Sequence, residues 1–215
     1  RYRGVMSLDL PLVRGHVDPA VALRDSVAPA ALVRAGEADV IVVDHSGFVL
    51  LDEAVASSSD TPALRRLRGD EATCALEGST ASFIGVAGGR PIVALETSRD
   101  EAEGTWEHLR AVGWRLGGDE AAVALTAVAL AGWHATYHFC GRCGSPVSLE
   151  SGGWAARCAS CDRVEYPRQD PAIIVLVQDH DGRVLLAHNA VEAGFRLDHR
   201  RLRRGWGIPG RDGCT

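Results

Sequence analysis

The stretch that decides the fold reads Phe139-Cys140-Gly141-Arg142-Cys143 and, beyond a spacer of fourteen residues, Cys158-Ala159-Ser160-Cys161. Two C-x2-C pairs at this separation can direct four thiolates at one tetrahedral zinc ion, with zinc–sulfur distances of about 2.3 Å. Cysteines grouped in this way bind metal more often than they pair, although two disulfides or redox pairs are the alternative. Four thiolates leave no coordination position for water or substrate, so we expect a structural zinc.

Between the two cysteine pairs, the sequence predicts a β-hairpin. Residues 147–149 and 154–156 are strand-like, and Ser151-Gly152-Gly153 supplies a glycine turn between them. This is the usual body of a zinc ribbon, and we assign the ribbon to residues 139–166. So short a segment cannot bury a useful core, so metal binding is expected to supply much of its folding free energy.

Upstream of the ribbon, β-branched runs predict a small sheet. Residues 39–44 and 48–51 form one predicted hairpin, and residues 81–87 and 91–95 form a second across Gly88-Gly89-Arg90. We assign this N-terminal mixed α/β domain to residues 1–117. Its single cysteine, Cys74, is expected to be a small buried apolar residue.

A connecting helix is predicted between the two domains, in segment 118–138. Its alanines and leucines favour a helix from Asp119 to Tyr137, with Asp119 as the N-cap. After the ribbon, residues 172–177 and 183–187 are expected to be paired strands around a turn at 179–182, and they open a new sheet. The predicted fold class is therefore α+β.

The bulk composition excludes some functional classes. The chain has a net charge of −5, and all 23 basic residues are arginine, which argues against a general nucleic-acid surface. No apolar run reaches the roughly 18–20 residues that span a bilayer, so no membrane is expected. The first residues lack the apolar core of a signal peptide, and we expect a cytoplasmic protein.

The order of motifs resembles one protein family. Trp133-His134, the two C-x2-C pairs, Glu165-Tyr166-Pro167-Arg168 and Asp170-Pro171-Ala172 follow one another as in the zinc-ribbon NADH pyrophosphatases (NAD+ diphosphatases) of the Nudix hydrolases. The resemblance covers about residues 110–187 well. It implies that residues 167–215 begin a Nudix α/β/α sandwich.

The resemblance also implies an activity. The family hydrolyses the pyrophosphate bond of NAD(H) to nicotinamide mononucleotide and AMP, and some members remove NAD caps from RNA. Mg2+ or Mn2+ would neutralise the charge of the diphosphate and activate water. In the family these metal ions are held by glutamates in the pattern G-x5-E-x7-R-E-x2-E-E. Family members commonly form dimers, so the resemblance implies a homodimer as one oligomeric state of this protein.

Two substrate-binding residues are implied by the resemblance. Tyr166 lies five residues after the last cysteine, as does a substrate-contacting tyrosine of the family. Arg110 matches a family arginine that could pair with phosphate. The alternative for Tyr166 is an aromatic residue of the core, and the alternative for Arg110 is a solvated surface charge. Where the family often has a substrate-contacting glutamate, this chain has Gly153, so one nucleotide contact is expected to be missing.

After Ala187 the resemblance ends in an aberrant tail that begins at about residue 188. The expected Nudix box is not found, and the acids of 191–215 (Glu192, Asp198 and Asp212) lack the helical spacing of a shared metal site. A basic tail and a phosphate-binding arm are two interpretations. We favour a third interpretation, translation in a shifted frame. Read one base later, the codons of Trp206 to Thr215 can spell Gly-Glu-Ser-Leu-Glu-Gly-Thr-Ala-Val-Arg. This peptide matches the Nudix box from its first glutamate through seven residues to the arginine.

Two consequences follow for the printed chain. We expect no appreciable pyrophosphatase activity and no catalytic residue within it, and poor order over residues 170–215. The alternative function is a non-catalytic zinc-ribbon module that binds a nucleotide or a protein. A zinc-ribbon nucleic-acid binder is the least favoured, because few basic residues lie within the ribbon.

Overall fold

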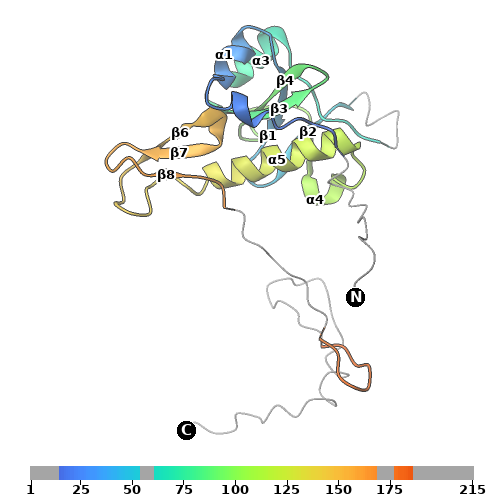
Figure 1. The fold of residues 1–215 in the computed structure, drawn as a ribbon. Coiled ribbons are helices and arrows are strands. Elements are labelled where there is room, and N and C mark those ends of the chain that lie inside the picture. Colours follow the sequence, from blue (N-terminus) through green and yellow to red (C-terminus); the bar gives the residue numbers. More distant parts are fainter. Residues whose placement is uncertain (1–14, 54–60, 169–176, 186–215) are drawn as a thin grey trace. The chain divides into compact units, whose positions relative to one another are not determined.

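The computed structural model describes residues 15–53, 61–168 and 177–185 and divides the chain into two compact units, residues 1–168 and 169–215. The first unit holds a sheet domain and the ribbon (Figure 1). Its sheet domain contains η2 Val21–Leu23, α1 Pro29–Arg34, β1 Asp39–Val43, β2 Phe48–Leu51, α3 Gly69–Leu76, β3 Thr80–Ala87, β4 Arg90–Glu96, β5 Thr105–His108, α4 Leu109–Val112 and α5 Gly118–His134. The ribbon contains β6 Val147–Glu150, η3 Ser151–Gly153, β7 Ala155–Cys158 and β8 Val164–Glu165.

The main sheet has five strands in the order β3-β4-β1-β2-β5. Both predicted hairpins are confirmed, because β1 pairs antiparallel with β2 and β3 pairs antiparallel with β4. The two hairpins join through a parallel pairing of β1 with β4, and β5 adds an edge strand beside β2. The sequence patterns predicted neither the parallel pairing nor β5.

Each face of this sheet is buried under helices. Neighbouring residues of a strand point to opposite faces, so Ile41 and Val43 pack under α5, whereas Val40 and Val42 pack against α1 and α3. Figure 1 shows the long helix α5 along one face and the two short helices on the other. A strand covered on both sides needs a continuous apolar run, which residues 40–43 provide.

The connecting helix differs from its prediction at both ends. Gly117 is the N-cap of α5, not Asp119, and the Asp119 carboxylate instead accepts a hydrogen bond from the backbone N–H of His16 at 2.5 Å. The helix ends at His134, three residues before the predicted end. Beyond it the His138 ring donates to the carbonyl oxygen of Ala135 at 2.9 Å, so a side chain replaces the next helical turn there.

The expectation for Cys74 was wrong, because its side chain is exposed. Ala72 and Leu76 are the buried residues of α3. These two are four residues apart and share the inward helix face, which places position 74 on the opposite face.

The second unit is described only at residues 177–185. The predicted turn is present there, because the backbone N–H of Asp179 donates to the Arg183 carbonyl at 3.0 Å and Gln178 pairs with Val184. Amides of Asp181 and Arg183 also donate to the Asp179 carboxylate. The rest of the two predicted strands, the remainder of the segment 170–215 that was expected to be poorly ordered, and the aberrant tail lie outside the described residues.

Candidate metal centre and substrate face

The ribbon is a three-stranded sheet in the order β6-β7-β8. The predicted hairpin is confirmed, since Val147 pairs with Cys158 and Glu150 pairs with Ala155. Each C-x2-C pair lies in a tight turn, closed by a bond from the Gly144 N–H to the Cys140 carbonyl and by one from the Asp162 N–H to the Cys158 carbonyl. These turns let the two cysteines of a pair point to the same side.

The four predicted ligands come together in one cluster. All four sulfur atoms of Cys140, Cys143, Cys158 and Cys161 lie within 4.8 Å of one another. Three of the sulfur–sulfur distances are 3.4 to 3.6 Å. A zinc ion with zinc–sulfur bonds of about 2.3 Å requires sulfurs about 3.8 Å apart at the corners of a tetrahedron. The donor set therefore fits zinc, and the ribbon carries a structural Zn2+ site.

Backbone amides make the cluster favourable for thiolates. The N–H of Arg142 donates to the Cys140 sulfur at 3.4 Å, and this amide followed by that of Cys143 lowers the pKa of Cys140. The Ser145 amide and hydroxyl lower the pKa of Cys143 to about 6. At Cys161 the Arg163 amide acts in the same direction, but burial and the neighbouring sulfurs outweigh it and raise the pKa to about 12. Negative charge on one sulfur therefore disfavours negative charge on its neighbours, and a bound Zn2+ ion would offset this repulsion.

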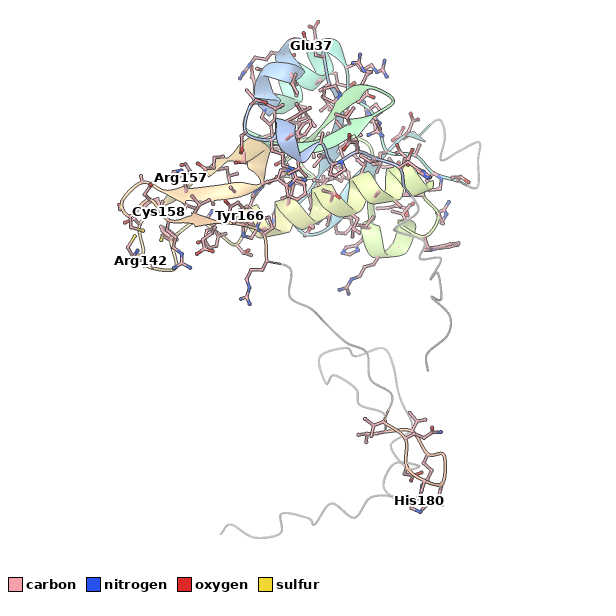
Figure 2. The ribbon with its side chains drawn as sticks, viewed as in Figure 1. Glu37, Arg142, Arg157, Cys158, Tyr166 and His180 are labelled. Atoms are coloured by element: carbon pink, nitrogen blue, oxygen red, sulfur yellow. The ribbon has the colours of Figure 1, made fainter. Side chains whose placement is uncertain are left out.

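The two proposed substrate-binding residues are both on the surface. Tyr166 is 64% exposed and directly follows β8 (Figure 2). Arg110 is an exposed residue of α4, whose backbone N–H donates to the His108 ring. Neither side chain closes a core, so the alternative of a core aromatic at Tyr166 is not what the structure shows.

The structure does not bring Tyr166 and Arg110 together. Tyr166 follows β8, which Figure 1 shows near the C-terminal end of α5. Arg110 lies in α4, which Figure 1 shows beside the N-terminal part of α5, and the 17 residues of α5 span about 25 Å. The two residues therefore lie toward opposite ends of α5 and do not form one site in the first unit.

Gly153 is held so tightly that no side chain fits there. Its φ is +94°, and a Cβ atom would lie 2.6 Å from the Ser82 hydroxyl oxygen. The ribbon turn packs here on β3, where the Trp154 indole N–H also donates to the Phe83 carbonyl at 2.7 Å. Where the family often has a glutamate, this chain thus has a glycine that lies against Ser82 of β3.

Sequence reasoning missed a buried pair beside this turn. His134 is 7% exposed, and its ring contacts the Glu96 carboxylate and the Gly153 carbonyl. Trp133-His134 was recognised only as part of a family motif. The one signal available was a histidine at the end of an apolar helix, which does not indicate its partners.

Comparisons with known protein families match two adjoining segments. Residues 37–133 match the NADH pyrophosphatase-like rudimentary NUDIX domain, and residues 135–166 match the NADH pyrophosphatase zinc ribbon domain. In the part of the chain that the structure describes, no helix combines the length and apolar character needed to cross a membrane.

Three relatives illustrate the extent of the similarity. Nudix hydrolase 19, chloroplastic, of Arabidopsis thaliana is 28% identical over 198 residues, 84% of this chain and 44% of the relative. The NAD-capped RNA hydrolase NudC of Yersinia pseudotuberculosis is 30% identical over 135 residues (60% and 50%). The NudC of Pasteurella multocida is 34% identical over 163 residues (73% and 58%). The chain thus spans about half the length of these relatives.

Proposed function

We propose, from the premise that this chain belongs to the zinc-ribbon NADH pyrophosphatase family of Nudix hydrolases, that the whole protein hydrolyses the pyrophosphate bond of NAD(H). The products would be nicotinamide mononucleotide and AMP. NAD-capped RNA is a second proposed substrate, because relatives of this chain are named NAD-capped RNA hydrolases. The observation that carries the proposal is the rudimentary NUDIX sheet packed directly against a four-cysteine ribbon that leads into Tyr166.

In this proposal the described residues support the reaction but do not perform it. The zinc shell is closed by four sulfurs, so it cannot activate water. Catalysis would require Mg2+ or Mn2+ on a glutamate cluster, and the printed sequence holds no Nudix box. We therefore propose that residues 1–215 alone are inactive and that the box is encoded in a shifted reading frame.

Tyr166 is the proposed substrate contact in this chain. Its exposed ring can stack on a base or on the nicotinamide ring, a contact worth about 1–3 kcal/mol for a nucleic-acid base. Arg110 is the proposed phosphate contact, and its distance from Tyr166 means that it would serve a second active site, as in a homodimer. The reduced four-thiol cluster is consistent with a cytoplasmic location.

The test compares two proteins from the same gene. One is the printed chain, and the other is the product of the DNA read onward in the frame that encodes a Nudix box. Each is incubated with NADH, and separately with NAD-capped RNA, in the presence of Mg2+ or Mn2+. We expect hydrolysis by the second protein alone. Turnover by the printed chain would contradict its proposed inactivity.

Sequencing the DNA from codon 187 onward decides the reading-frame hypothesis. No Nudix box in any frame would reject that hypothesis. Binding of NADH by the printed chain without hydrolysis, together with a confirmed C-terminus, would instead support the non-catalytic nucleotide-binding module.

A further inference from the structure

The turn of the zinc ribbon is attached to the sheet domain by side chains as well as by close packing. The Arg24 guanidinium lies 3.5 Å from the centroid of the Trp154 ring, and the Ser151 hydroxyl donates to the Asp25 carboxylate at 2.6 Å. Gly153 lies against Ser82. These contacts come from η3 and the residue after it, at the end of the hairpin that carries no cysteine.

His134 lies where the sheet, the long helix and the ribbon turn meet. Its Nδ1 atom is 2.6 Å from a Glu96 carboxylate oxygen, and its Nε2 atom is 2.7 Å from the Gly153 carbonyl oxygen. The Ser82 hydroxyl donates to the same Glu96 oxygen at 3.0 Å. The His134 and Glu96 side chains are only 6% and 10% exposed. One residue from α5 thus links the end of β4 to the ribbon.

The chemistry of the two oxygen atoms that contact the His134 ring fixes the number of protons in this arrangement. A carbonyl oxygen only accepts, so the Nε2 atom of His134 must carry a proton. A second proton must lie between Nδ1 and the Glu96 oxygen, because two lone pairs would otherwise face each other at 2.6 Å. The pair therefore holds two protons and has no net charge, so its burial costs less free energy than that of a single unpaired charge.

The hairpin connects this joint to the zinc site. Cys158 ends β7, and Ala155 begins it beside the turn, so about 10 Å of paired strand separates the metal ligand from the docked residues. Because β6 and β7 are paired along this whole length, fixing the position of one end of the hairpin restricts the position of the other. Zinc at one end would hold the turn in shape, and a docked turn would hold Cys158 in place.

We propose that His134 and Glu96 form a proton-holding joint through which zinc binding and the stability of the sheet domain are coupled. Coupling of this kind is reciprocal: zinc stabilises the sheet domain, and the intact joint slows the loss of zinc. The joint operates in the sheet domain and ribbon alone and is independent of any hydrolytic activity. No part of the metal shell or of the proposed substrate contacts belongs to it.

The test uses the full chain with His134→Ala and a matched control, His45→Ala. His45 is exposed, lines the same cavity of about 240 Å3 as His134, and lies outside the ribbon. Zinc release to a chelator is followed by absorbance, and the melting temperature is measured with and without zinc. We expect His134→Ala to release zinc about 5- to 50-fold faster and to lose most of its zinc-dependent melting shift. The control should match the wild type.

Two outcomes would overturn the joint. One is a His134→Ala chain that melts earlier but releases zinc at the wild-type rate with the full zinc-dependent shift, because His134 would then be an ordinary core residue. The other comes from nitrogen-15 NMR of the wild-type chain, which needs no variant to fold. We expect a proton on the Nε2 atom of His134, and a bare Nε2 would contradict the contact with Gly153.

Discussion

At the scale of single residues, the structure shows how buried polar groups are satisfied. The Asp44 side chain is 5% exposed in the turn after β1. Its carboxylate accepts from the amides of Ser46 and Phe48 and from the Ser46 hydroxyl, and lies 3.1 Å from the Arg99 guanidinium. Burial alone would raise the pKa of Asp44, but these four partners outweigh it and lower the pKa below its ordinary 3.8.

Replacing Asp44 with asparagine should therefore destabilise the sheet domain in a pH-dependent way. A lowered folded-state pKa means that the carboxylate contributes stability above 3.8, and that this contribution is lost as the pH falls through the folded-state value. We expect Asp44→Asn to lower the free energy of unfolding by about 1–3 kcal/mol at neutral pH, and less in acid. Urea unfolding at several pH values measures this. Asp100→Asn, at an exposed position, is the control and should change little.

Gly153 gives a second prediction at this scale. An alanine there must adopt a left-handed φ, and its Cβ would meet Ser82, so we expect Gly153→Ala to cost about 1–3 kcal/mol of unfolding free energy. Gly132→Ala is the matched control, because a Cβ at that helical position meets no atom closer than 3.8 Å. The control should be neutral or up to about 1 kcal/mol more stable. Equal effects of both substitutions would argue against a close approach at Gly153.

At the scale of the elements, the ribbon has a four-cysteine cluster but little apolar core of its own. Its described side chains are mostly half-buried or exposed, and its buried residues sit in β7, in the docked turn and among the cysteines. Arg157 also ties the strands together, through the carboxylates of Glu150 and Asp162. Surface ion pairs of this kind contribute little compared with a bound zinc ion.

We expect one zinc ion per chain, bound by the four-cysteine cluster. Cys158→Ser should remove most of the zinc, because a serine hydroxyl is a poor ligand and leaves the tetrahedral shell incomplete. Cys74→Ser is the control, since Cys74 is exposed on α3 and lies outside the cluster. Metal analysis of the two purified proteins decides the point. Full zinc content in Cys158→Ser would mean that the cluster is not the zinc site.

At the scale of the whole molecule, the first unit combines two parts with different sources of stability. The sheet domain buries two apolar clusters, one on each face of the five strands. The turn of the ribbon packs on this domain, and the cysteines at its other end form the zinc site. The two parts should therefore respond differently to loss of the metal.

Chelation of zinc should loosen the ribbon and leave the sheet domain folded. In hydrogen exchange we expect the amides of β6, β7 and β8 to lose protection after chelation, because the hairpin has little core of its own. Amides of β1 and β4 lie in the buried centre of the sheet and should keep most of their protection, because loss of zinc lowers the stability of the sheet domain without unfolding it. Loss of protection throughout the chain would show that the sheet domain also depends on zinc for its fold.

Local patterns were sufficient for much of this structure. The C-x2-C spacing determined the ligands, and glycine turns between β-branched runs determined the hairpins 39–51, 80–96 and 147–158, since both depend on residues close in the chain. Helix ends were less predictable. Asp119 has the right residue type for an N-cap, but it pairs with the distant backbone of His16 instead.

Tertiary structure alone decided which of these pieces meet. The parallel pairing of β1 with β4 follows from the burial of both sheet faces, which no short window of sequence encodes. The separation of Tyr166 from Arg110 depends on the length and placement of α5. The pairing of His134 with Glu96 and Gly153 joins residues 38 and 19 positions apart, and it forms only when the helix, the sheet and the ribbon pack together.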